Sequence, residues 1–285
     1  MENCLLLQTD FGLSDGAVSA MYGVSNRVSP TLHIYDLTHD IPPYNIWEAS
    51  YRLLQTVTYW QEGTVFVSVV DPGVGSERKS VAVKLKSGQY IITPDNGTLT
   101  HVKKYIGIEE ARQINENKDR LPDSYQSHTF HGRDVYAYNG ARLAANQVKF
   151  EELGSKMTTS ELVELPTKEA KKTDQFVEGT IDVLDIRFGS LWTNIHHELF
   201  AKLNVHYGDQ VEIAIKNKER EVYKNTMKFA KSFADARIGE PLLYINSLLN
   251  LAVAINQESF SKVYNIGTGI DWSISCRKAP KIVYE

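Results

Sequence analysis

Acidic, basic and imidazole side chains gather in three turns of the first half of the chain. Asp10 and Asp15 stand in the turn 9–15, Asp71 and Arg78 begin and end the glycine-rich turn 71–78, and His131 lies in the segment 129–134. A carboxylate held by a guanidinium stays ionised, because a nearby cation favours the charged form. Beside a neutral imidazole, such a carboxylate is suited to taking a proton from water. The three turns therefore predict general-base chemistry.

Each turn also has a purely structural interpretation. Asp10 and Asp15 are suited to capping their turn and the following helix. Asp71 and Arg78 are equally suited to an ion pair that holds a hairpin. The turn between them is rich in glycine like a phosphate-binding loop, but it lacks the Gly-Lys-Ser/Thr ending. His131 precedes a helical pattern, where the helix dipole keeps an imidazole neutral, although structural histidines are more common. Spacing alone leaves these interpretations open.

Residue types that ligate metals are present, but they do not fall in a recognised spacing. The chain has no His-Glu-x-x-His motif and no paired cysteines. We therefore expect neither a catalytic metal nor another cofactor. The residues considered are His33, Asp36, His39, Asp40, His196 and His197.

Regular elements alternate around these turns in the first half of the chain. Strand-like apolar runs cover 4–8, 32–37, 64–70, 80–85 and 90–93, and helical spacing covers 15–28, 45–60 and 134–146. Strands interleaved with helices predict a layered α/β domain over 1–165 with a mostly parallel sheet. In such sheets ligands bind where the strands end.

The pattern changes in the second half. It loses its period between 153 and 174, and we assign 166–173 as a linker. Short alternating runs at 176–185, 210–216, 221–227 and 242–246 follow, separated by turn residues. They predict a smaller all-β, barrel-like domain over 174–285. A fourth polar and aromatic turn, 188–194, lies in this part and is suited to lining a flat ligand.

Composition limits the classes of partner. The net charge of −4 gives no electrostatic footprint for nucleic acid, and no stretch approaches the roughly 20 apolar residues that span a bilayer. Cys4 and Cys276 are too few for a disulfide framework. The N-terminal apolar run is too short for a signal peptide. We expect a soluble, cytoplasmic protein with a small-molecule substrate.

Seven motifs in order extend the argument to a family. They are TDFG at 9–12, DLTHDIPP at 36–43, VDPGVG at 70–75, PDNG at 94–97, TFHGRD at 129–134, WTNI at 192–195 and NS at 246–247. Together they resemble the S-adenosylmethionine hydroxide adenosyltransferases, relatives of the fluorinase and chlorinase enzymes. The resemblance implies an α/β N-terminal domain, a β-barrel C-terminal domain and a homotrimer. It also implies that each ligand lies between the N-terminal domain of one subunit and the C-terminal domain of its neighbour.

The resemblance further implies hydrolysis of S-adenosyl-L-methionine to adenosine and methionine by in-line attack of water on the 5′ carbon of the ribose. Asp71, Arg78 and His131 match the catalytic set. Asp71 would take or orient the proton, His131 would position the water, and Arg78 would hold Asp71 ionised and stabilise developing hydroxide. Which of Asp71 and His131 is the base stays open. The substrate-binding residues expected from the resemblance are Asp10, Asp15, Tyr44, Phe130, Gly132, Phe188, Ser190, Ser247, Asn256 and Gln257.

Departures from the family pattern keep other functions open. Ser190 stands where relatives have Asn, Leu248-Leu249 replaces a more polar pair, and Ala17 lacks a hydroxyl present in the fluorinase. The halogenating relatives have Tyr in place of Asp71. The alternatives are halide-dependent adenosyl transfer on the same scaffold, a non-catalytic binding protein for S-adenosylmethionine or a nucleoside, and a metal-dependent phosphoesterase.

Overall fold

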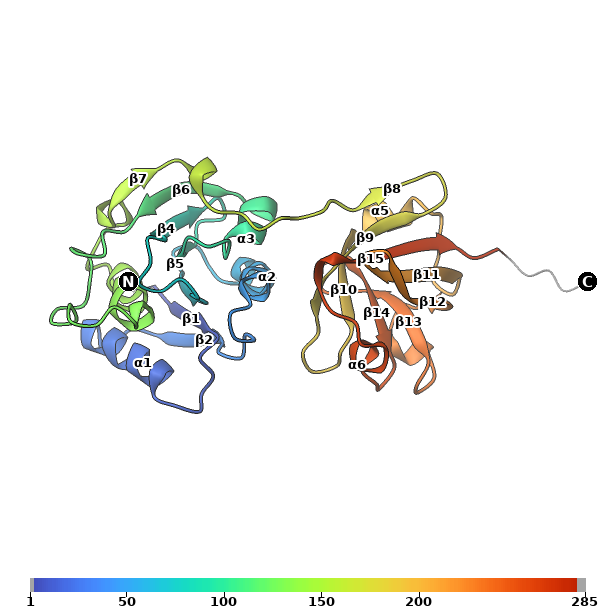
Figure 1. Cartoon of the computed structure of the whole chain (residues 1–285), viewed down its shortest axis with the longest axis horizontal. Coiled ribbons are helices and arrows are strands. Elements are labelled where there is room, and N and C mark those ends of the chain that lie inside the picture. Colours follow the sequence, from blue (N-terminus) through green and yellow to red (C-terminus); the bar gives the residue numbers. More distant parts are fainter. Residues whose placement is uncertain (1–2, 281–285) are drawn as a thin grey trace, which may run out of the picture. The chain divides into compact units, whose positions relative to one another are not determined.

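The computed structural model describes residues 3–280. The chain separates into two compact units, Met1–Leu165 and Pro166–Glu285, which are described one at a time (Figure 1). Within the segment expected as a linker, the short strand β8 (Lys171–Lys172) pairs with β9 (Val177–Leu184). Part of that segment thus belongs to the sheet of the second unit.

The first unit contains a seven-stranded sheet in the order β2-β1-β3-β5-β4-β6-β7. Four neighbouring strands run parallel, and the remaining three continue the sheet in antiparallel pairs. The parallel strands are β1 (Leu5–Thr9), β2 (Ile34–Thr38), β3 (Val65–Val69) and β5 (Tyr90–Pro94), and the others are β4 (Ser80–Leu85), β6 (Ile108–Gln113) and β7 (Ser155–Met157). The parallel strands are those whose ends carry the predicted chemistry.

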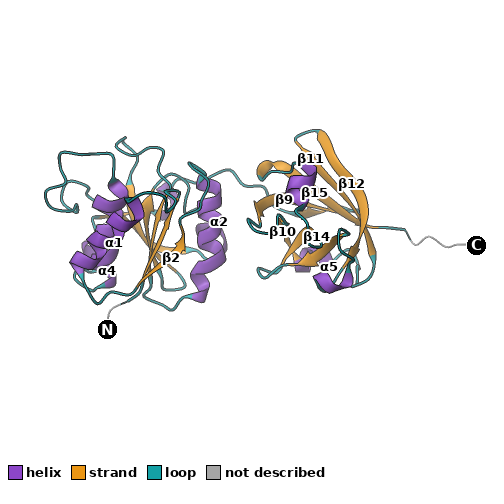
Figure 2. Cartoon of the chain, turned by 90° about the horizontal axis from the view of Figure 1, so that it is seen from below, coloured by secondary structure: helices purple, strands orange, loops and turns teal. Residues whose placement is uncertain are grey.

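Helices cover both faces of this sheet (Figure 2). Side chains of a strand alternate between the faces, so Leu5 and Leu7 join one apolar cluster and Leu6 joins the other. One cluster includes residues of α1 (Ala17–Val28), the π-helical segment η2 (Gly132–Ala137) and α4 (Tyr138–Ala144); the other includes residues of α2 (Ile46–Thr56) and α3 (Thr100–Tyr105). Because both faces of the sheet are covered, side chains that point to either face are apolar. The parallel strands therefore appear in the sequence as continuous apolar runs.

The sequence did not indicate every element of this unit. The segment 134–146 is helical, but its helix starts earlier, with the π-helical turn at Gly132. The helix over 45–60 ends at Thr56 and continues as the 3₁₀ turn η1 (Val57–Tyr59). Strand β6 was not predicted, because its alternation includes the charged residues Glu109, Glu110 and Arg112. Short 3₁₀ turns η3 (Phe150–Glu152) and η4 (Thr159–Glu161) complete the unit.

The second unit is a β-barrel, as the alternating runs predicted. Its strands follow the order β10-β14-β13-β12-β11-β15-β9, and pairing of β9 with β10 closes the circle. Apolar residues from all around the barrel fill its interior. The strands besides β9 are β10 (Leu191–His196), β11 (Gln210–Asn217), β12 (Arg220–Phe229), β13 (Pro241–Ile245), β14 (Asn250–Ile255) and β15 (Gly269–Lys278); the helices are α5 (His197–Ala201), η5 (Phe233–Asp235) and α6 (Phe260–Tyr264).

No helix within residues 3–280 is both long enough and apolar enough to cross a membrane.

Candidate active site

The predicted catalytic residues meet at the carboxyl ends of β1 and β3. From β1 the chain continues to α1 and β2 on one side, whereas β3 lies on the other side of β1. The strand order therefore reverses between β1 and β3, and such a switch point opens a crevice that binds ligands. Asp10 directly follows β1, and Asp71 follows β3 after Val70.

A cavity of about 340 Å³ lies at this crevice. That volume is within the range of small-molecule sites. Six of its lining residues were predicted from the sequence, whereas Arg78 and Asp15 are not among those that line it. The lining consists of Asp10, Phe11, Pro43, Tyr44, Val69, Asp71, Val74, Thr129, Phe130, His131 and Gly132.

The turn after β3 folds Arg78 back onto Asp71, as expected from their spacing. Nε of Arg78 lies 3.0 Å from each carboxylate oxygen of Asp71, and Nη2 lies 2.7 Å from Oδ2. Both side chains are nearly buried. Burial alone would lower the pKa of Arg78, but the hydrogen bonds and charge interactions with Asp71, Tyr136 and Glu116 together outweigh burial and raise it. Arg78 is therefore a cation that binds both oxygens of the Asp71 carboxylate.

Every N–H of the Arg78 guanidinium has an acceptor. Besides Asp71, Nη2 donates to Nδ1 of His131 at 2.8 Å, and Nη1 donates to Ser80 Oγ at 3.1 Å and Glu116 Oε1 at 2.7 Å. A guanidinium has five N–H groups, and these contacts use all of them. In this arrangement each N–H group of Arg78 is already directed at a protein acceptor.

The imidazole of His131 lies between two arginines. Because a guanidinium only donates hydrogen bonds and a neutral imidazole has one acceptor nitrogen, the shorter contact, 2.8 Å from Nη2 of Arg78, makes Nδ1 the acceptor. The proton is then on Nε2, so its 3.4 Å contact with Nη1 of Arg120 is not a hydrogen bond. Burial lowers the pKa of His131, and the charges of Arg78 and Arg120 lower it further, against the opposing effects of Glu116 and Asp71. The ring is therefore neutral at pH 7.

Asp10 is fixed by the backbone of the turn that precedes α2. Its Oδ2 accepts from the backbone N–H of Tyr44 at 2.8 Å. Tyr44 has a φ of 66°, a left-handed conformation that is uncommon for a bulky residue and is found preferentially at functional sites. Its side chain is 73% exposed and lines the cavity. These two predicted ligand contacts therefore lie together.

A chain of hydrogen bonds through the buried His39 connects the turns that follow β1 and β2. Thr9 Oγ1 lies 2.8 Å from Nδ1 of His39, and Nε2 of His39 lies 2.7 Å from Asp36 Oδ1. Thr9 also accepts from the backbone N–H of Phe11. The motif at 36–43 thus serves to connect the end of β2 with the end of β1.

Asp15 has the structural role that the sequence left open. Its carboxylate accepts from the backbone N–H of Ala17 at 2.8 Å, at the start of α1. Its other predicted role is substrate binding, but the side chain of Asp15 is exposed and is not among those that line the cavity.

Aromatic rings form one wall of the cavity, next to Gly132. The rings of Phe11 and Phe130 meet edge to face with their centroids 5.9 Å apart. A Cβ at Gly132 would approach Phe11 to 3.2 Å and Phe130 to 3.4 Å. The absence of a side chain at Gly132 therefore leaves room for both rings.

The predicted residues of the second unit lie at two ends of the barrel. The turn between β9 and β10 exposes Phe188, whose side chain is 71% accessible, and approaches α6 through a hydrogen bond from Ser261 to Gly189. Asn256 and Gln257 follow β14 at this same end, because β10 and β14 pair antiparallel with Leu191 opposite Val253. Ser247, between β13 and β14, lies at the opposite end.

Ser190 is buried within the second unit. Its exposed fraction is 2%, and its side chain hydrogen-bonds with Tyr244. Asn256 also uses its side-chain amide within the unit, in a 2.8 Å hydrogen bond to the carbonyl of Ala236. Of the residues predicted at this end, Phe188 and Gln257 are the exposed ones.

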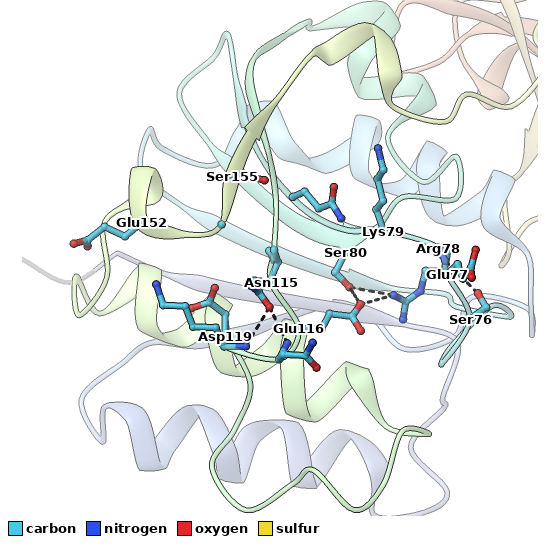
Figure 3. Close-up of a pocket in the computed structure, with 15 residues that line it drawn as sticks. Ser76, Glu77, Arg78, Lys79, Ser80, Asn115, Glu116, Asp119, Glu152 and Ser155 are labelled. Carbon is cyan, nitrogen blue, oxygen red and sulfur yellow. Dashed lines mark hydrogen bonds and ion pairs between the residues drawn. The ribbon is translucent and has the colours of Figure 1, made fainter.

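A second, more polar cavity of about 730 Å³ lies against Arg78 (Figure 3). Its lining includes Arg78, Ser80 and Glu116, whereas Asp71 and His131 line the first cavity. Figure 3 shows the side chains of Arg78, Ser80 and Glu116 converging. The Arg78 guanidinium thus hydrogen-bonds both to residues that line the first cavity and to residues that line the second.

Glu116 was missed in the sequence because its segment, 115–120, resembles an ordinary charged surface loop. The register of the sheet, which a local sequence pattern does not report, is what places Glu116 beside Arg78. In the antiparallel pair β4 and β6, Val81 lies opposite Gln113. The chain after Gln113 therefore runs beside the chain before Val81, where Arg78 and Ser80 lie.

One group of residues within 3–280 brings metal-ligating atoms close together. It consists of His196, His197 and Glu198, whose ligand atoms lie within 4.8 Å of one another. None of the three lines the cavity that contains Asp71.

Comparisons with known proteins identify the family to which both units belong. Residues 5–154 match the SAM hydroxide adenosyltransferase N-terminal domain, and residues 179–273 match the corresponding C-terminal domain. The (R)-S-adenosyl-L-methionine hydrolase of Methanocaldococcus jannaschii is 34% identical over 92% of each chain. The fluorinase of Actinopolyspora mzabensis is 28% identical over 93% of this chain and 95% of its own.

A solved structure shows the same fold over nearly the whole length. The uncharacterized conserved protein from Thermotoga maritima is 32% identical, with a TM-score of 0.85 over 96% of this chain and 100% of its own. Both units of the chain thus have counterparts in one family, and their order is the same. The chain belongs to the SAM hydroxide adenosyltransferase family.

Proposed function

We propose that the protein hydrolyses S-adenosyl-L-methionine to adenosine and L-methionine. A water oxygen forms a bond to C5′ of the ribose while the C5′–S bond breaks, and the electron pair of that bond goes to the sulfur. The water loses one proton in the process. Sulfonium and a hydroxide-like nucleophile cancel their charges, so a closed site of low polarity favours this step without a metal or other cofactor.

The observation that carries the proposal is Asp71, a carboxylate that is paired with Arg78 and lines a cavity at the switch point of the sheet. Halide transfer is disfavoured there, because a carboxylate repels an anion 4 Å away by about 1 kcal/mol in water and about 4 kcal/mol at an effective dielectric constant of 20. Water is not repelled, and the carboxylate accepts its proton. The tyrosine of the halogenating relatives lacks this charge.

The contacts of the three side chains favour Asp71 as the base. His131 accepts from Arg78 through Nδ1, and the pKa of its ring is lowered. In this tautomer Nε2 already carries a proton, and Nδ1 can take one only by breaking its hydrogen bond from Arg78. Arg78 has no free N–H and acts by holding Asp71. Holding the reactants in line contributes up to roughly 7–11 kcal/mol to lowering the barrier.

We further propose that Asp10 and Tyr44 bind the ribose, that Asp15 and Ser247 bind the methionine end, and that Phe188, Asn256 and Gln257 lie at the adenine. We expect a cytoplasmic homotrimer in which the second unit of one subunit completes the cavity of its neighbour. Mixing Asp71→Asn subunits with Phe188→Ala subunits tests this arrangement. Mixed assemblies would regain activity that neither variant has alone, and failure of complementation with confirmed exchange of subunits would argue against shared sites.

Product analysis tests the reaction itself. The purified protein is incubated with substrate in the presence of a chelator, and the products are separated by chromatography. Because the name of the M. jannaschii relative specifies the (R) form, the two sulfonium epimers are supplied separately. Adenosine and methionine in equal amounts are expected. Unchanged substrate with both epimers would exclude hydrolysis, and a halogenated deoxyadenosine formed in high chloride or fluoride would favour the alternative reaction.

A further inference from the structure

We propose that Glu116 is a positioning residue for the hydrolytic site, acting through Arg78 and His131 rather than on the substrate. The inference rests on the proposed function for its kinetic part. Glu116 is one of the residues that line the polar cavity shown in Figure 3. Its side chain is 28% exposed there.

The contacts of Glu116 reach both partners of the base. Oε1 accepts from Nη1 of Arg78 at 2.7 Å, and Oε2 lies 3.5 Å from Nδ1 of His131. Ser80 Oγ lies 2.5 Å from Oε1 and 2.8 Å from the hydroxyl of Tyr136. Tyr136 belongs to η2 and is fully buried, so this chain of hydrogen bonds anchors Glu116 to the core of the first unit. Glu116 thus holds the end of the guanidinium opposite Asp71.

This placement determines where the guanidinium directs its other donors. With Nη1 held by Glu116 and Ser80, the planar guanidinium cannot rotate, and Nε and Nη2 remain aimed at Asp71 and His131. The charge of Glu116 also opposes the lowering of the His131 pKa by the arginines. Burial would raise the pKa of Glu116, but its hydrogen bonds with Ser80 and Arg78 outweigh this and lower it. Glu116 is therefore an anion at neutral pH.

The test compares Glu116→Gln with Glu116→Asp. The amide of Gln still accepts from Arg78 but lacks the charge, whereas Asp keeps the charge on a shorter side chain. For Glu116→Gln we expect kcat to fall by about 10-fold to 100-fold with KM unchanged, and the pKa of His131, followed by NMR of the free protein, to decrease. Glu116→Asp is expected to restore the His131 pKa and part of kcat.

The groups that face Glu116 must be included in interpreting a pH profile. They are Arg78, Ser80 and His131 in direct contact, and Tyr136 through Ser80. Asp71 and Arg120 face His131. Of these, the His131 ring is the group followed by NMR, and its titration is measured separately from activity.

Glu152→Gln is the matched control, because Glu152 lines the same polar cavity and caps η3 through Lys149. It is expected to leave kcat and the His131 pKa unchanged. Wild-type kcat and an unchanged His131 pKa in Glu116→Gln would overturn the proposal. If the wild-type protein forms no adenosine, the proposed function fails, yet the NMR comparison still decides whether Glu116 acts on His131. If Glu116→Gln does not fold, Glu116→Asp decides, since a purely structural role would leave its KM and kcat at wild-type values.

Discussion

Nη2 of Arg78 lies 2.8 Å from Nδ1 of His131, and since arginine only donates, this contact fixes the imidazole as an acceptor at Nδ1. The same nitrogen of Arg78 also binds Asp71. One guanidinium therefore sets both the charge of the proposed base and the tautomer of the neighbouring histidine.

Replacing Asp71 with Asn removes the proposed base while preserving its shape. We expect kcat to fall by about 100-fold or more, because general-base catalysis typically contributes 10²–10⁴. Substrate affinity, measured by calorimetry, should change little. Glu77→Gln, an exposed change in the same turn, is the control. Near-normal turnover of Asp71→Asn would remove Asp71 from its assigned role.

Arg78→Lys keeps a positive charge but loses the planar set of five donors. Asp71 would then be left with an imperfect partner in a nearly buried position. Since breaking a buried pair costs 3–5 kcal/mol, we expect the free energy of unfolding to fall by about 3 kcal/mol in this partly conserved variant. Urea unfolding measures the difference. A loss of activity without any loss of stability would instead indicate a direct contact of Arg78 with the reactants.

The tautomer of His131 is directly measurable. Nitrogen NMR is expected to find the proton on Nε2 and a ring pKa below the ordinary value of about 6.5. In the pH range between the lowered pKa and 6.5, the unfolded chain binds the proton more readily than the folded one. The contribution of His131 to stability therefore decreases as pH falls through that range. A proton found on Nδ1 would contradict the arrangement.

His101, outside the site, should dominate the acid sensitivity of the first unit. Burial lowers its pKa to about 4, and its ring packs edge-on against Trp47 and Tyr51. The folded state thus resists protonation between pH 6.5 and 4, and stability should fall by about 3 kcal/mol across that interval as the pH decreases. Urea unfolding at several pH values measures this slope.

His101→Phe should flatten the slope, because the ring contacts remain and the titrating group is gone. His128→Gln, at an exposed position, should leave it unchanged. An identical pH dependence in the wild type and His101→Phe would show that other groups cause the acid sensitivity.

Local sequence was enough to predict the α/β and β-barrel parts and the elements that precede the site. The apolar run of β3 and the glycine-rich turn after it led directly to Asp71 and Arg78, because residues seven positions apart across a tight turn are brought together by the turn itself. The resemblance of seven ordered motifs supplied the family, which the comparisons then established.

What only the tertiary structure decided was the pairing of distant segments. Glu116 is 38 positions from Arg78 and His131 is 53, and no local pattern reports the strand order and register that place them at one guanidinium. Sequence also left the helix-capping contact of Asp15 and the burial of Ser190 undetermined, since accessibility depends on what packs against a side chain. The sequence by itself thus determined which chemical groups are present, and the folded sheet decided which of them touch, because contact between distant residues depends on strand order and register rather than on spacing along the chain.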